Sequence, residues 1–120
     1  MRSILPVLAI LSLFAPSVCL AKRVQAKPVA PVVVGDMRIE APLDSGRVGR
    51  IQAFDRLDGH LLWSLVVFEN KIDPQMEEDV QWRFIESMKV VANGLEITVE
   101  MGARYHVDLK THKVVKLATP

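Results

Sequence analysis

The sequence predicts an all-β protein, folded as a small antiparallel sandwich of about seven strands. Apolar and polar residues alternate with period two through most of the chain from Val32 onward, and this is the pattern of strands that bury one face. Short polar turns separate the alternating stretches. One of these turns contains Asn93-Gly94, the pair that most strongly favours a tight hairpin.

The first half of the domain predicts one strand and then a hairpin. Residues 32–41 predict a half-buried strand, because Met37, Ile39 and Ala41 alternate with Arg38 and Glu40; the Pro-, Asp- and Gly-containing residues 42–47 predict a loop. Residues 48–54 alternate again, and a polar turn separates them from the apolar run Leu61 to Phe68. The two apolar stretches therefore predict two paired strands.

The connection that follows carries the signals of a single helical turn. Asp73 precedes Pro74, as in a helix cap, and the acidic residues 77–79 are favourable near a helix start. Residues 80–91 fit either period, because apolar residues recur both at every second and at every fourth position. The hairpin signal directly after them favours a strand, while residues 74–85 stay open between helix and strand.

The last third predicts three further strands. Residues 95–99 and 105–109 alternate apolar and polar side chains, and the apolar-rich stretch 113–117 ends the chain. With the earlier strands they make two hairpin units, hence a small sandwich or a partial propeller-like meander.

Residues 1–21 predict a secretory signal peptide. Arg2 precedes an apolar run from Ile4 to Phe14, and small residues lead to a cleavage site after Ala21. The apolar run is too short for a membrane span of about 20 residues, so no stable membrane insertion is expected after cleavage. The mature protein is expected in the periplasm or outside the cell. The alternative is a lipoprotein acylated at Cys19, although the preceding Val18 stands where a small residue is expected.

Removal of 21 of the 120 residues leaves 99, a length that fits one domain. Residues 22–31 are basic, small and Pro-containing and predict a flexible arm, and residues 32–120 form the single β domain. Of 15 Lys and Arg one lies in the leader, so the mature chain balances 14 acidic residues and offers no attraction for nucleic acid. The only cysteine leaves with the leader, so neither a disulfide nor thiol chemistry is expected.

One turn has a sharper pattern, Ala-x-Asp-x-x-Asp-Gly-x-x-x-Trp, formed by Ala53, Asp55, Asp58, Gly59 and Trp63. An Asp at a strand end can accept hydrogen bonds from backbone N–H groups of the turn, a Gly can take a left-handed conformation, and the Trp can pack on a neighbouring sheet.

The pattern resembles the tryptophan-docking repeat of pyrroloquinoline quinone (PQQ) dehydrogenase-like β-propellers, which prefer Thr where this chain has Asp58. The chain also resembles small exported bacterial proteins with such repeats. The resemblance covers roughly 20 residues and implies a blade-like scaffold. In that family the quinone lies at the centre of a many-bladed ring, which two blade equivalents cannot close, so no cofactor is expected.

A weaker echo follows about 53 residues later, where Gly49 aligns with Gly102 and Asp55 with Asp108. This spacing favours a duplicated hairpin unit. Chance similarity between two hairpins is the alternative.

The sequence predicts no metal site and no catalytic group. His60, His106 and His112 lack the spacing of a zinc motif, and the acidic residues 77–79 lack the alternating ligands of a calcium loop. The serines have no nucleophile motif. An enzyme is therefore unsupported by the sequence, although it is not excluded.

The leading hypothesis is an exported, non-enzymatic β-module that binds another protein, or itself, through a sheet face or edge. Its candidate interaction residues are Trp63, Trp82, Arg83 and Tyr105, because aromatic residues and Arg dominate binding hot spots. The alternative is a small-ligand-binding protein or hydrolytic enzyme with a pocket between the two hairpin units, using His60 or His106.

Overall fold

The computed structural model describes residues 25–118. The described chain contains eight strands and two short 3-10 turns, and the predicted all-β class is confirmed. The strands are β1 (Val32–Val34), β2 (Met37–Glu40), β3 (Val48–Asp55), β4 (Leu61–Glu69), β5 (Ile85–Val91), β6 (Gly94–Val99), β7 (Arg104–Asp108) and β8 (Val114–Leu117); the 3-10 turns are η3 (Asp79–Gln81) and η4 (Glu100–Gly102).

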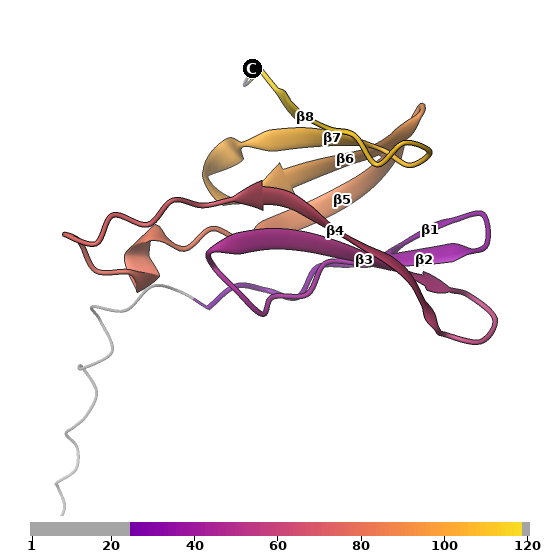
Figure 1. The fold of residues 1–120 in the computed structure, drawn as a ribbon, viewed down its shortest axis with the longest axis horizontal. Helices are drawn as coiled ribbons and strands as arrows, with labels where there is room; N and C mark the ends of the chain where they lie inside the picture. Colours follow the sequence, from indigo (N-terminus) through magenta and orange to yellow (C-terminus); the bar gives the residue numbers. More distant parts are fainter. Residues whose placement is uncertain (1–24, 119–120) are drawn as a thin grey trace, which may run out of the picture.

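The strands form two four-stranded antiparallel sheets. Sheet A has the order β1-β2-β3-β4 and sheet B the order β5-β6-β7-β8, so each sheet is a meander of consecutive strands. The sheets pack on each other as a sandwich. The hairpin turns β1–β2, β3–β4, β5–β6 and β7–β8 lie at the same end of the molecule, and the β2–β3 and β6–β7 connections lie at the other end (Figure 1). The first edge strands of the sheets, β1 and β5, also lie next to each other.

The core lies between the sheets and follows the period-two pattern. In β3 and β6, alternate side chains are buried, and those of Ile51 and Ala53 from β3 and of Leu95 and Ile97 from β6 are fully enclosed. No polar or charged residue is buried in the described chain. Apolar packing therefore stabilises the core.

The strand count differs from the predicted number because residues 32–40 form a hairpin rather than one strand. Gly35, at φ 57°, allows the chain to reverse between β1 and β2. The predicted turn at Asn93-Gly94 is present, but it is displaced by one residue. Ala92 and Asn93 form the turn, and Gly94 is the first residue of β6, paired with Val91.

The expected strand beginning at Val80 was wrong in its boundary, since β5 begins only at Ile85. Gln81 is held in η3, where its side-chain amide donates to the carbonyls of Asp73 (3.0 Å) and Glu77 (2.9 Å). These bonds tie the segment into a loop before it reaches the sheet. The Asp73 side chain accepts from the Gln75 N–H at 2.9 Å in a turn rather than a helix.

The predicted signal peptide lies outside the described residues. Residues 25–31 have no regular secondary structure, and Val29 among them packs against the core. Between residues 25 and 118, no helix has the length and apolar character needed to cross a membrane.

Candidate functional site

The turn between β3 and β4 is closed by the side chain of Asp55. Its Oδ1 accepts the backbone N–H groups of Leu57 (2.8 Å) and Asp58 (3.2 Å). The backbone N–H of Gly59 donates to the Asp55 carbonyl at 2.9 Å, with Gly59 in the left-handed region at φ 79°. Asp58 Oδ1 then accepts the N–H of His60 at 2.9 Å. The acidic residues of the motif thus satisfy turn amides.

The turn between β7 and β8 repeats these hydrogen bonds. Asp108 Oδ1 accepts the N–H groups of Lys110 (2.8 Å) and Thr111 (2.9 Å), and the Asp108 carbonyl accepts the N–H of His112 (2.8 Å). Thr111 Oγ1 accepts the N–H of Lys113 at 3.2 Å, as Asp58 does for His60. His112, at φ 64°, stands in the position of Gly59. Two turns 53 residues apart therefore share one geometry, whereas duplication of the whole unit stays a prediction.

Asp55→Ala is expected to lower the free energy of unfolding by about 1 kcal/mol, because two turn amides lose their acceptor. Asp55→Asn keeps a side-chain oxygen at this position and should lose less than half as much. Denaturant unfolding of both variants measures the difference. Equal losses would show that the charge of Asp55, rather than its acceptor oxygen, stabilises the turn.

Asp55, Asp58 and His60 are also the one group of described residues whose potential metal-ligating atoms lie within 4.8 Å of one another. Their oxygens already accept turn amides, and His60 Nδ1 contacts Asp58 Oδ1. The N–H of His60 lowers the pKa of Asp58, because it stabilises the carboxylate. The corresponding turn at Asp108 has the same hydrogen bonds, with Thr111 at the position of Asp58. Turn closure therefore accounts for this cluster.

A second cluster joins the loop before β3 to η3. The guanidinium of Arg47 donates two hydrogen bonds of 2.5 Å to the carboxylate of Glu78, and the Trp82 indole N–H donates to the same carboxylate at 3.0 Å. These donors lower the pKa of Glu78 to about 2, Arg47 contributing most. The Trp82 ring lies so close to Gly46 that a side chain there would overlap it, at 2.1 Å from the Trp82 Cγ. Trp82 is thus part of the scaffold at this end.

Glu78 is expected to contribute an acid-sensitive part of the stability. Because its pKa falls from 4.5 to about 2 on folding, its contribution is complete above pH 4.5 and is lost as pH decreases toward 2. Glu78→Gln removes the charge and should abolish this part of the pH dependence. Unfolding in denaturant at several pH values measures it. Glu77→Gln, at the adjacent exposed position, should keep the wild-type dependence of the free energy of unfolding on pH. The same wild-type dependence in Glu78→Gln would contradict the prediction.

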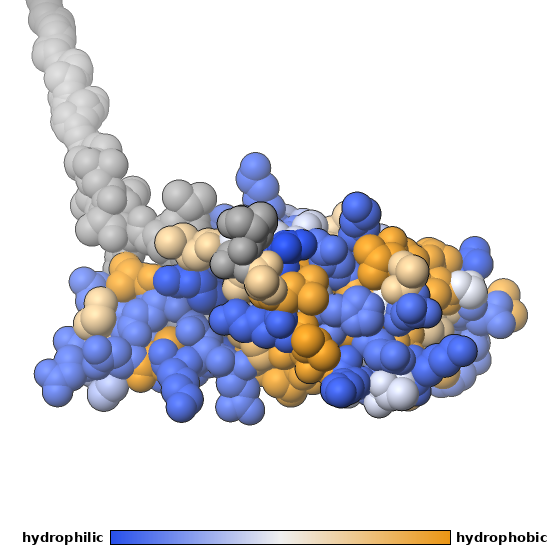
Figure 2. All heavy atoms as spheres, turned by 90° about the horizontal axis from the view of Figure 1, so that it is seen from above, coloured by the Kyte–Doolittle hydropathy of each residue, from blue (hydrophilic) through white to orange (hydrophobic). Residues whose placement is uncertain are grey.

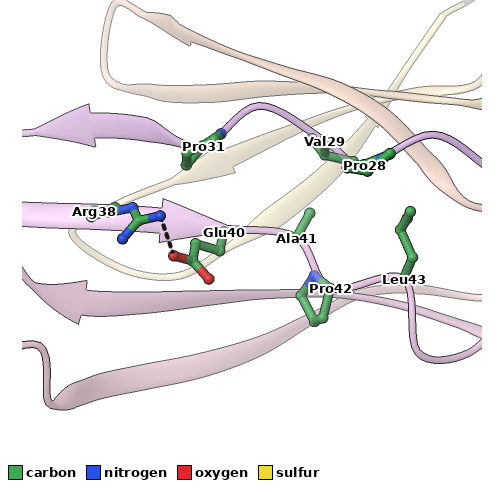
Figure 3. Close-up of a pocket in the computed structure, with 8 residues that line it drawn as sticks. All are labelled: Pro28, Val29, Pro31, Arg38, Glu40, Ala41, Pro42 and Leu43. Carbon is green, nitrogen blue, oxygen red and sulfur yellow. Dashed lines mark ion pairs between the residues drawn. The ribbon is translucent and has the colours of Figure 1, made fainter.

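A surface hollow of about 360 Å³ lies beside β2. Figure 3 shows Pro28, Val29 and Pro31 on one side of it, with β2 and the following loop on the other. Its charged groups, Arg38 and Glu40, already form an ion pair at 3.0 Å. The remaining lining is apolar, so the hollow offers no group poised for acid, base or nucleophilic chemistry.

The predicted interaction residues do not come together on one surface. Trp63 faces inward from β4, and its ring lies 4.5 Å from that of His112. Tyr105 stacks on Phe68 at 5.5 Å between the sheets. Trp82 and Arg83 lie next to η3, where the Arg83 guanidinium donates to the Trp82 carbonyl at 2.9 Å. All four side chains are partly buried.

A hollow of about 250 Å³ does lie between the two halves, bordered by Phe68, Arg83, Tyr105 and Lys116 among others. Neither His60 nor His106 borders it. His106 instead lies on the outer face of sheet B, between Glu96 and Val115 in the strand register. The histidines of the alternative hypothesis therefore do not line this hollow.

The sheet edges differ sharply in how they are protected against strand pairing. β1 has 3 residues and follows Pro31, β8 has 4 residues with Lys116 among them, and β5 carries exposed Glu86 and Lys89 and lies next to β1. Short strands, Pro and charges are the usual protections of an edge.

β4 is neither short nor charged along its length and has no Pro; its only departure from a regular edge is a pair of β-bulges, which lie on either side of the stretch Trp63–Val66. It has 9 residues, pairs only with β3 among the described strands, and carries a single charge at its last residue, Glu69. The side chains of Leu61, Leu62 and Val66 are 50%, 41% and 46% exposed. The pairing of β4 with β3 is interrupted by two β-bulges, at each of which β4 has one extra residue. Only Trp63–Val66 therefore pair with β3 in regular register. The sequence showed this apolar run but carried no signal that its strand lies at an edge.

One row of side chains across each outer face shows more apolar residues on sheet A than on sheet B. On sheet A, a row across all four strands consists of Val33, Arg38, Phe54 and Leu61. The corresponding face of sheet B carries Lys89, Glu96, His106 and Val115 in one row. Figure 2, which looks from above, shows hydrophobic atoms reaching the surface among hydrophilic ones, most of all toward the end that carries the hairpin turns.

Comparisons with protein-family models, with curated proteins and with solved structures gave no match. Each sheet has the four-stranded meander topology of a propeller blade. The resemblance to the PQQ-type repeat stays a prediction.

Proposed function

We propose that this protein is an exported, non-enzymatic β-module that binds a protein segment by strand addition to the free edge of β4. In this mode an extended segment pairs with the edge through main-chain hydrogen bonds, and side-chain contacts on both faces add specificity. The observation that carries the proposal is the combination, on one strand, of a free edge and three exposed apolar side chains.

Physical chemistry favours occupation of this edge over its exposure to water. The free edge of a strand presents a row of N–H and C=O groups without sheet partners, and charges or Pro normally discourage their pairing. Leu61 to Phe68 has neither. A paired segment would also cover Leu62 and Val66, and buried apolar surface contributes roughly 25 cal/mol per Å². The predicted signal peptide supports a partner in the periplasm or outside the cell.

A photo-crosslinking side chain, p-benzoylphenylalanine, tests the proposal when it replaces Ser64 in the middle of β4. Ser64 is exposed, so the substitution leaves the core intact. Illumination in the producing cells should yield a protein adduct. The control carries the same side chain at Ser87, an exposed serine of β5, and should yield no adduct. No adduct from position 64, or equal adducts from both positions, would refute binding at β4.

A further inference from the structure

We infer that the segment paired with β4 is the β4 strand of a second copy, related by a two-fold axis through Ser64. This inference rests on the proposed function, since it names the partner of the same edge. The product would be a dimer in which the two A sheets join into one continuous sheet. Such a contact is self-complementary, because the same surface is used by both copies.

The side-chain order of β4 is symmetric about Ser64. Within the regular stretch, Trp63 and Leu65 flank Ser64 on the inner face, and Val66 lies two residues from Ser64 on the outer face; Leu62, two residues before Ser64, is the extra residue of a β-bulge and is exposed. An antiparallel two-fold pairing therefore places Trp63 opposite Leu65 of the second copy and brings Leu62 near its Val66. Apolar and aromatic pairs of this kind stabilise neighbouring antiparallel strands. The two Ser64 hydroxyls meet at the axis and can hydrogen-bond to each other.

The charges are compatible with this pairing. Glu69, the only charged residue of β4, lies five residues from the axis, so the two copies of Glu69 fall at opposite ends of the interface. Arg50, next to Val66 on the outer face, is already paired with Asp44. No like charges on β4 are brought face to face, whereas like charges directly opposite destabilise paired strands. The regular stretch Trp63–Val66 contains the axis.

A cysteine at position 64 tests the geometry directly. Across the two-fold axis the two Cα atoms would lie about 4.5 to 5.5 Å apart, within the range that a disulfide spans. Ser64→Cys is made in the full chain with Cys19→Ser, so that one thiol remains. Mild oxidation should give a disulfide dimer at about tenfold higher yield than Ser87→Cys in the same background. Equal yields, or no dimer from Ser64→Cys, would overturn the inference.

Sedimentation equilibrium supplies a second measurement that needs no thiol. The wild-type chain should dimerise reversibly, and Ser64→Lys should weaken the dimer about tenfold or more, because two cations meet at the axis. Ser87→Lys should leave the dimer unchanged. Self-pairing would be refuted by a monomeric wild type, or by a dimer that Ser87→Lys weakens more than Ser64→Lys does. If p-benzoylphenylalanine at position 64 then still gives adducts whose mass differs from that of two copies, strand addition at β4 stands with a different protein as partner. If it gives no adduct, both proposals fail.

Discussion

Replacement of Ile97 by alanine should lower the free energy of unfolding by about 3 kcal/mol, within the range of about 2 to 5 kcal/mol for such truncations. Ile97 lies at the centre of sheet B, between Met88 and Tyr105 in the strand register, and is fully enclosed. Truncation removes apolar contacts and leaves a cavity. The described domain has no cysteine to form a disulfide, so the loss is a large fraction of a total stability of about 5 to 15 kcal/mol.

Urea unfolding followed by circular dichroism measures this loss as a lower midpoint with an unchanged slope. Val115→Ala is the matched control, because Val115 lies on β8 with 44% of its surface exposed. Its loss should stay within about 0.5 kcal/mol. A loss below about 1 kcal/mol for Ile97→Ala would contradict a core located between the two sheets.

Gly94→Ala should destabilise the fold by about 2 to 3 kcal/mol, from overlap as well as backbone strain. The added Cβ would lie 2.0 Å from the carbonyl oxygen of Val107, which belongs to the neighbouring strand β7. A backbone atom inside a sheet cannot move away as a flexible side chain can. Gly94 also has φ 157°, outside the conformations that other residues prefer.

Gly59→Ala separates the two causes. Gly59 has φ 79° but no atom within 4 Å of an added Cβ, so only conformational strain of about 1 to 2 kcal/mol remains. Thermal or denaturant unfolding of both variants should show the larger loss for Gly94→Ala. The reverse order would mean that β6 and β7 are farther apart than this register places them.

The strands were predictable because burial of one sheet face imposes a period of two on the sequence. That period located most of β3, β6 and β7 correctly. The hairpin between Val32 and Glu40 was missed because β1 is only three residues long, too short to show a period, and Gly35-Asp36 was its only turn signal. The start of β5 was also misplaced, since Gln81 forms side-chain hydrogen bonds to a loop, and such side-chain bonds leave no periodic signal.

The candidate site was much less predictable than the fold. Trp63 and Tyr105 were natural choices for an interaction surface, yet strand alternation turns both toward the second sheet. The sequence of β4 shows an apolar strand, but whether a strand is central or at an edge depends on the order of strands in the sheet. The position of β4 at the end of sheet A appears only in the structure.

The meander order of each sheet has a consequence for how the chain folds. All strand pairs join consecutive segments, so every ladder can zip up from its own turn without first closing a long loop. Proteins dominated by such short-range contacts fold faster than sandwiches whose strands cross between sheets. The slow step should therefore be the docking of two preformed sheets. Asn70, at the start of the connection, hydrogen-bonds the carbonyls of Gly46 and Gln81 at 3.2 Å and 2.6 Å. These bonds hold the connection folded back beside both sheets in the native protein.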